Sequence, residues 1–166
     1  MELPKMLIDT VVEENTQVGN VIKYYSFDFN ISLHKRVLLK KEKRLVIISK
    51  GTYDVHYGDG SHWPEEYYAC IYINDHNYPY ISDDKVLKSQ QLIASPKKYR
   101  SFLKNDSFFD CSTLTTHEVD KIKNVVEKSP GRVLGKIDND DLDAIRNVLR
   151  NSITIPPKQK RLFGLM

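Results

Sequence analysis

Cysteine is scarce in this sequence: Cys70 and Cys111 are the only two in 166 residues. Two cysteines are too few for a disulfide scaffold, and neither lies in the CxxC or Cys/His spacing of a zinc site. We therefore expect both to be reduced and buried, because free cysteine is among the residue types most often found in protein interiors. The alternative is a catalytic thiol, which no activating neighbour in the sequence favours.

Long hydrophobic runs are also missing. The most apolar stretch, residues 45–48, is far shorter than the roughly 20 residues that a membrane span needs. Residues 1–6 lack the apolar run of a signal peptide, so we expect a cytoplasmic protein without membrane contact. There are no repeats or low-complexity segments, and 40% of the residues are hydrophobic, which predicts one folded domain.

The formal net charge of +3 is small, but the charge is unevenly distributed. Acidic residues gather between positions 138 and 143; they lack a further ligand at metal spacing, so we predict helix capping and no metal. A basic cluster can hold a phosphate backbone, although lysines also protect exposed sheet edges. The basic residues gather between positions 35 and 44, opposed only by Glu42: Lys35, Arg36, Lys40, Lys41, Lys43 and Arg44.

Strand-like patterns of apolar and aromatic residues occupy residues 18–29, 45–48, 67–73 and 108–114. In the third of these, alternation predicts Tyr68, Cys70 and Tyr72 on one face and Ala69, Ile71 and Ile73 on the other. The remaining segments predict connections: a charged connection over 30–43, a turn at 49–51, a long polar loop over 51–66 and a short return strand at 78–81.

Two helices are predicted after these strands. Thr115 and Glu118 fit a capping box at the start of the first helix, with apolar residues at helical spacing up to Val126. The second begins at residue 138 or 139. Its apolar residues recur every three or four positions: Leu142, Ile145, Leu149 and Ile153. Strand signals too close for helical crossovers, followed by helices, predict an α+β fold with a strongly bent antiparallel sheet or small barrel.

Four segments carry a resemblance to a known family. Residues 19–29 read Gly-Asn and then alternating apolar and aromatic residues, and residues 43–49 read Lys-Arg before an apolar strand. Residues 105–116 read Asn-Asp-Ser before a strand that ends in Thr-Thr, and residues 131–149 read Gly-Arg before a short amphipathic helix. In this order the segments resemble the PemK/MazF family of toxin endoribonucleases.

The resemblance implies an SH3-like bent antiparallel β-barrel with two or more short helices, including a C-terminal amphipathic helix. It places this barrel at residues 18–155, between an irregular N-terminal extension (1–17) and a basic C-terminal tail (156–166). It also implies a homodimer that cleaves single-stranded RNA without metal or cofactor. A protein antitoxin, or a structured RNA antitoxin, would hold it inactive.

The sequence departs from the family where the family places its chemistry. Arg44 stands at the family's arginine, but Leu45 replaces the proline that follows it. The strand over 67–73 ends in Asn74-Asp75 where the family has Thr or Ser, and Thr115-Thr116 stands where it has Arg-Thr. The alternative is therefore a non-catalytic binding protein on the same fold, phage- or plasmid-borne, that binds a host protein or nucleic acid.

Cleavage of RNA through its 2′-hydroxyl requires a base, an acid and a cation for the phosphorane. We expect Arg44 to be the cation and His56, His62 and Thr116 to be the catalytic candidates, with His76 a further possible acid or base. The simpler interpretations are a surface arginine, exposed loop histidines and a helix-capping threonine. The residues expected to contact RNA through charge or stacking are Lys35, Arg36, Lys41, Lys43, Tyr53, Tyr57 and Trp63.

Overall fold

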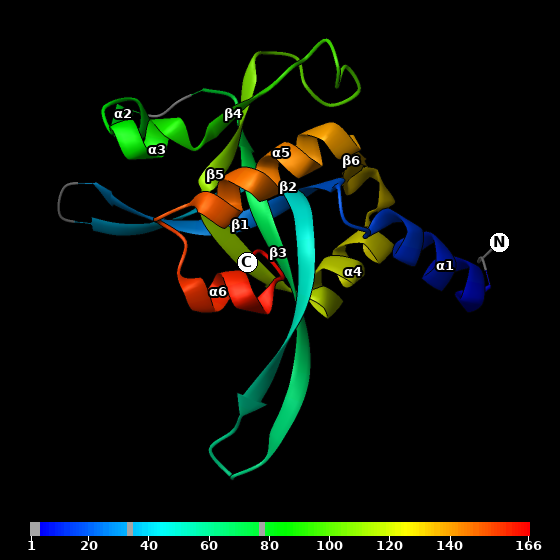
Figure 1. The fold of residues 1–166 in the computed structure, drawn as a ribbon. Helices are drawn as coiled ribbons and strands as arrows, with labels where there is room; N and C mark the ends of the chain where they lie inside the picture. The colour runs from blue at the N-terminus through cyan, green and yellow to red at the C-terminus, as the bar shows by residue number, and fades with distance from the viewer. Residues whose placement is uncertain (1–3, 33–34, 77–78) are drawn as a thin grey trace.

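The fold is α+β, as predicted (Figure 1). The computed structural model describes residues 4–32, 35–76 and 79–166; for residues 25–32, 35–41, 79 and 80 it describes the backbone alone. The described residues form one antiparallel sheet in the order β4-β5-β3-β2-β1-β6. Its strands are β1 (Asn20–Ser32), β2 (Lys35–His56), β3 (His62–Asn74), β4 (Gln91–Ala94), β5 (Ser107–Glu118) and β6 (Val133–Lys136).

Strand β3 separates two hydrophobic clusters, one on each face of the sheet. Ala69, Ile71 and Ile73 belong to one cluster, and Tyr68 and Cys70 belong to the other. The predicted alternation along this strand is therefore confirmed. Both cysteines are free and buried, also as predicted, and burial raises the pKa of each thiol.

Helices cover both faces. Helix α4 (Val119–Lys128) places Val119, Ile122 and Val126 in the cluster of Tyr68, and α1 (Lys5–Asn15) packs against α4. On the opposite face, α5 (Asn139–Asn151) packs through the predicted residues Leu142, Ile145 and Leu149. Ile153 was predicted on the same stripe but lies beyond the helix and is 81% exposed.

The helix starts differ in how well the sequence marks them. Asp138 caps α5 by accepting a hydrogen bond from the backbone N–H of Asp141 at 2.8 Å. The capping box at Thr115 is wrong, because β5 continues through Thr115 and Thr116 to Glu118. These β-branched residues pair with β3, and this ladder outweighs the local capping signal.

The predicted connections over 30–43 and 51–66 are also wrong, because the described residues of both segments belong to long β-hairpins. Strands β1 and β2 pair through Ser32 and Lys35, and we call residues 25–32 and 35–42 the β1–β2 arm. Strands β2 and β3 pair through His56 and His62, and we call residues 52–66 the β2–β3 arm. Both arms project from the body of the protein (Figure 1). The turn predicted at 49–51 is wrong, because Ser49, Lys50 and Gly51 pair with β3; the pairing register shifts just before them, between Ile47 and Ser49.

Both chain ends contain a helix. Residues 5–15 form α1, whose Val12 is buried, instead of an irregular extension. The expected basic tail contains α6 (Pro157–Leu162) and then Phe163 and Leu165, which are 3% and 1% exposed in the core. The carbonyl of Phe163 accepts a hydrogen bond from Ser49 Oγ at 2.7 Å. Apolar side chains therefore dock the chain end against β2, because burying them outweighs the solubility of the lysines that precede them.

The remaining elements are short. The return strand expected at 78–81 is wrong: residues 79–82 form α2 (Pro79–Ser82), with Ile81 buried, whereas residue 78 lies outside the description. Asp84 caps the N-terminus of helix α3 (Lys85–Ser89), and a 3₁₀ turn η1 (Pro130–Arg132) precedes β6. Within the described part of the chain, no helix has both the length and the apolar character that a membrane crossing requires.

Candidate functional site

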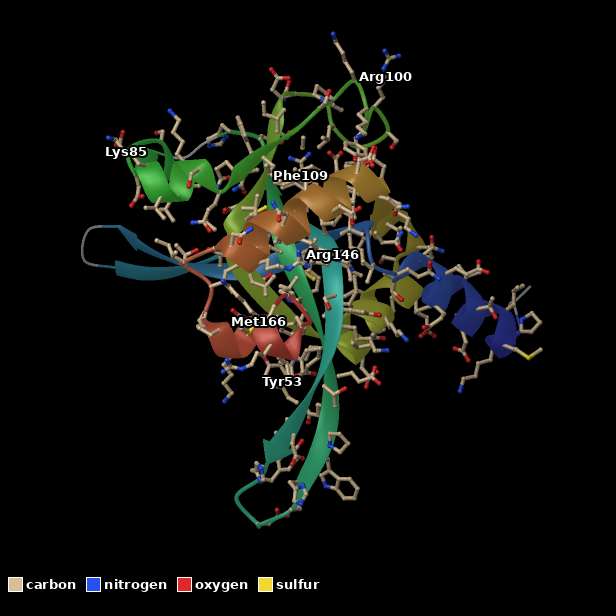
Figure 2. All side chains as sticks on the ribbon, viewed as in Figure 1. Tyr53, Lys85, Arg100, Phe109, Arg146 and Met166 are labelled. Atoms are coloured by element: carbon tan, nitrogen blue, oxygen red, sulfur yellow. The ribbon has the colours of Figure 1, made fainter. Side chains whose placement is uncertain are left out.

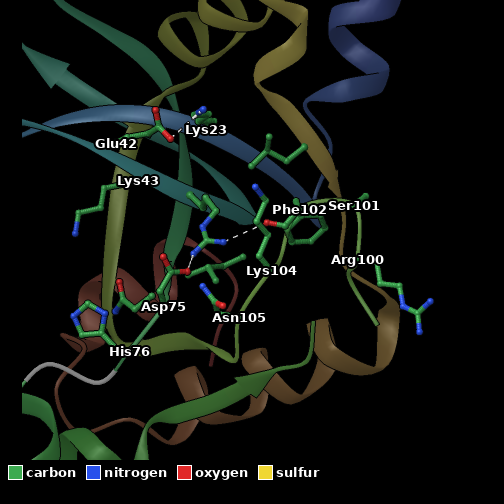
Figure 3. Close-up of a pocket in the computed structure, with 14 residues that line it drawn as sticks. Lys23, Glu42, Lys43, Asp75, His76, Arg100, Ser101, Phe102, Lys104 and Asn105 are labelled. Carbon is green, nitrogen blue, oxygen red and sulfur yellow. Dashed lines mark hydrogen bonds and ion pairs between the residues drawn. The ribbon is translucent and has the colours of Figure 1, made fainter. Parts of the chain in front are cut away.

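A groove of about 520 Å³ lies beside the end of β3, between the sheet and residues 100–105 (Figure 3). The sheet brings its floor together, because Arg44 of β2 pairs with Lys23 of β1 on one side and with Ile73 of β3 on the other. Its charged lining comprises Lys23, Lys43, Arg44, Arg100, Lys104, Glu42 and Asp75, and His76 also lines it. Five basic side chains against two carboxylates give the groove a positive charge.

Arg44 is held in a defined orientation in this groove. Its Nη2 forms an ion pair with Asp75, and its Nη1 donates a hydrogen bond to the carbonyl of Phe102 at 3.3 Å. The Arg44 side chain is 19% exposed, whereas Asp75 is 57% exposed and also accepts from Ser107 Oγ at 3.4 Å. A guanidinium has five N–H donors, so these contacts fix its plane and leave donors for an oxyanion.

The wall opposite Arg44 is built around Phe102. Its ring stacks on Tyr99 with ring centroids 5.3 Å apart and lies directly over Gly135 of β6. A Cβ at position 135 would be 2.9 Å from the Phe102 ring, so only glycine allows this approach. The close contact thereby places the Phe102 carbonyl within reach of Arg44.

Tyr99 ties this wall to the start of α5. Its hydroxyl donates to Asp141 and accepts from the backbone N–H of Asp138 at 3.2 Å. Lys98 forms ion pairs with both carboxylates, 3.1 Å from Asp141 Oδ2. Burial and the Asp141 carboxylate raise the pKa of Tyr99, and Lys98 lowers the pKa of Asp138. The acidic cluster at 138–143 thus both caps α5 and anchors the groove wall.

The electrostatics of the groove favour anions. Lys23 pairs with Glu42 at 3.1 Å across β1 and β2, and Lys43 Nζ lies 5.3 Å from the centre of the Tyr72 ring. The carboxylates of Asp75 and Glu42 balance only part of the basic lining. A phosphate entering beside Arg44 would therefore meet a positive potential on a partly enclosed surface, where charge interactions are less screened than in bulk water.

The histidines expected to act with Arg44 lie elsewhere. His56 and His62 face each other at the end of the β2–β3 arm, with ring centroids 5.2 Å apart. Both approach Asp54: His62 Nδ1 is 3.0 Å from Oδ1 and His56 Nε2 is 3.8 Å from Oδ2. Arg44 and His56 are twelve positions apart on β2, which corresponds to a distance of about 35–40 Å along a strand. Within one chain these side chains do not form a single site.

Thr116 is also outside the groove. It is exposed on β5 opposite Ala69, whereas Arg44 is opposite Ile73 of the same neighbouring strand. Those two β3 positions are four residues apart, about 13 Å along the strand. The buried side chain of Ile71 lies between them. The threonine that matches the resembled family is therefore separated from the arginine that matches it.

The aromatic residues predicted to stack on RNA bases are all on the β2–β3 arm, whose side chains project on both faces (Figure 2). Tyr53 packs against Phe163 with centroids 6.1 Å apart, and burial raises the pKa of its hydroxyl. Tyr57 donates a hydrogen bond to Glu65, and Trp63 is 64% exposed. None of the three lines the groove.

Among the predicted cationic residues, Lys43 lines the groove with Arg44. The side chains of Lys35, Arg36 and Lys41 lie outside the described part of the structure, although their backbone belongs to β2. The described residues include no cluster of three or more His, Cys, Asp or Glu side chains that could hold a metal ion.

Sequence reasoning missed the wall of the groove and the partner of Arg44. Asp75 was noted only as the replacement for a hydroxyl, and Phe102 was not singled out. One signal was present: residues 97–104, for which no helix or strand was predicted, contain the basic side chains Lys97, Lys98, Arg100 and Lys104. A second basic cluster could have indicated a second side of one anion site.

Comparison with known proteins leaves this geometry as the main evidence for function. No protein-family model matches the chain. A search of curated proteins likewise finds no match.

Proposed function

We propose that the groove binds single-stranded RNA and that the protein cleaves it without a metal ion, as a toxin-type endoribonuclease. One observation carries this proposal: Arg44, the arginine predicted from sequence, lines one positively charged groove together with His76. A cation and an imidazole that can accept a proton are two of the three requirements of metal-free RNA cleavage.

In this proposal Arg44 donates hydrogen bonds to the non-bridging oxygens of the scissile phosphate. The negative charge of the phosphorane then develops against a guanidinium that Asp75 and Phe102 already orient. His76 accepts the proton of the 2′-hydroxyl as that oxygen attacks phosphorus. The bond to the 5′-oxygen breaks, water in the open groove supplies its proton, and the products are a 2′,3′-cyclic phosphate and a 5′-hydroxyl.

The test is incubation of the purified protein with single-stranded RNA in excess EDTA. Replacing Arg44 by Lys keeps the charge but loses the planar fork, and we expect a loss of cleavage of about 10²-fold. His76→Asn should lose cleavage but retain RNA binding, because it removes proton transfer and leaves the basic lining intact.

Two variants serve as matched controls. Arg161→Ala removes an exposed basic residue on α6, and His62→Asn removes an exposed histidine on the β2–β3 arm. Both residues lie outside the groove, so cleavage should stay near the wild-type rate. Unchanged cleavage by Arg44→Lys and His76→Asn would contradict the proposal, as would products without a cyclic phosphate.

A second candidate function is binding of nucleic acid without cleavage. Asp75 favours this function, because its carboxylate forms an ion pair with Arg44. It does so at the strand end where the family that the sequence resembles has Thr or Ser. RNA that is retained by the protein, released by Arg44→Ala and recovered intact would support this alternative. RNA that is neither bound nor cut would contradict both.

The proposal includes a homodimer and an antitoxin that covers the groove. A protein antitoxin would present carboxylates to the basic lining, and an RNA antitoxin would present phosphates. Growth arrest on expression of the chain alone, relieved by a neighbouring gene product, would support this part. Nuclease treatment of the purified complex distinguishes the two kinds of antitoxin, because only an RNA antitoxin is destroyed.

A further inference from the structure

The β2–β3 arm carries the charge opposite to that of the groove. Residues 52–66 contain the carboxylates of Asp54, Asp59, Glu65 and Glu66 and no lysine or arginine. Three of these residues, Asp54, Asp59 and Glu66, are exposed on the arm surface; Glu66, at the base of the arm, pairs with Lys50 at 2.8 Å. One protein therefore presents an acidic projection and a basic groove.

The arm also has two features of a protein contact surface: it extends beyond the rest of the sheet, and it exposes large aromatic side chains. Beyond the pair Gly51–Tyr67, its two strands continue without pairing to β5, whose register ends opposite Tyr67. An isolated two-stranded hairpin is only marginally stable in water. The arm nevertheless exposes Trp63 to 64% and Tyr57 to 45%, and large aromatic side chains of this kind are enriched at protein interfaces.

The acidic charge decides which kind of partner fits. Phosphate groups of a nucleic acid would be repelled by these carboxylates, whereas a basic protein surface would be attracted. The groove around Arg44 is such a surface, but the arm cannot reach the groove of its own chain. Arg44 and His56, where β2 reaches the end of the arm, are about 35–40 Å apart along the strand, and a paired strand does not fold back on itself.

We infer that the β2–β3 arm of one copy docks into the Arg44 groove of a second copy of this chain. Each copy has one β2–β3 arm and one Arg44 groove, so a twofold axis allows both contacts to form in the same dimer. Asp59 at the turn would approach the basic lining at Lys104 and Arg100, and Trp63 would cover the apolar part of the lining at Phe102.

This contact would regulate the groove. The arm and an RNA phosphate use the same positive lining, so they compete for it. At high protein concentration most grooves are occupied by an arm, and the apparent affinity for RNA falls in proportion to the fraction of grooves that remain open. The competition rests on the proposed RNA-binding function, whereas the pairing of arm and groove does not.

The pairing is tested by disulfide trapping between two single variants of the full chain. Asp59→Cys places a thiol at the arm turn, and Lys104→Cys places one at the groove; Cys70 and Cys111 are buried. Under mild oxidation, the mixed variants should give a covalent heterodimer. The matched control replaces Asp59→Cys by Glu127→Cys, an exposed acidic position on α4. A heterodimer yield no higher than that of the control overturns the inference.

Mass in solution and RNA affinity provide the second test. The wild type should be a dimer at low salt and dissociate at high salt, because salt screens the charge attraction. Trp63→Ala should weaken dimerisation by roughly tenfold or more and, where the wild type is dimeric, bind RNA more tightly. A monomer at all concentrations overturns the inference, and equal RNA affinity of dimer and variant overturns the competition. If neither the wild type nor Trp63→Ala binds RNA while the wild type is a dimer, only the proposed function is contradicted.

Discussion

Replacing Gly135 by Ala is expected to disturb the groove by displacing the ring of Phe102, which forms part of its wall. The added Cβ would lie 2.9 Å from Phe102 Cε1 and 3.0 Å from Cδ1, closer than carbon atoms pack in proteins. The Phe102 ring would therefore have to shift, and it is confined by its stack on Tyr99. Because the hydrogen bond from Arg44 to the Phe102 carbonyl is already 3.3 Å long, such a shift would break it.

The expected magnitude follows from two opposing effects. Overpacking of a well-filled site costs about 1–3 kcal/mol. Exchanging glycine for alanine within a strand returns about 0.5–1 kcal/mol, because the unfolded chain loses freedom. We expect a net loss of about 1–2 kcal/mol in the free energy of unfolding. A less well oriented Arg44 should also weaken RNA binding, by about fivefold for a loss of ~1 kcal/mol.

Urea unfolding and an RNA-binding titration measure the two effects. Gly131→Ala is the matched control, because a Cβ there meets nothing within 4 Å. The double variant with Phe102→Leu should recover part of the stability, since neighbouring residues that clash are not additive. If Gly135→Ala shifts the urea midpoint no more than Gly131→Ala, the proposed role of the close contact is refuted.

Three further predictions concern the rest of the fold. Gly51→Ala should destabilise by about 1–3 kcal/mol in urea unfolding, because its Cβ would meet the C-terminal segment at 2.9 Å, whereas Gly58→Ala should be neutral. Leu165→Ala should cost about 2–5 kcal/mol and Met166→Ala almost nothing, and equal midpoints would contradict the docked chain end. Burial lowers the pKa of His117, so the unfolded state binds more protons and stability should fall as pH drops below 6.5. Thermal unfolding across this range should show a flatter pH dependence for His117→Gln, and an unchanged slope would exclude the histidine as its source.

The predicted fold class and the elements with strong local periodicity are confirmed. Alternation over residues 67–73 predicted both faces of β3, and apolar spacing predicted the buried sides of α4 and α5. These patterns depend on strand and helix repeats of two and 3.6 residues, which are visible within a short window. Boundaries failed where pairing overrode local signals, as at Thr115, which belongs to β5 and not to a helix cap.

The candidate site was predictable only in part. Arg44 and Lys43 were identified from charge and resemblance, and both line the groove. The prediction that His56 and His62 act with Arg44 assumed a loop that could fold back over the sheet. Those histidines instead end a paired hairpin, because residues 52–56 and 62–66 form a continuous ladder. A ladder is rigid along its length, so it carries the histidines away from the groove.

The sequence by itself determined an α+β chain with buried free cysteines and a basic cluster that contains Arg44, because composition and short-range periodicity encode these properties. Only the tertiary structure decided which side chains surround that arginine. Asp75 is 31 residues from Arg44 in the chain and Phe102 is 58 residues away. Such contacts arise from strand register and from the packing of a distant loop over Gly135, which no local pattern specifies.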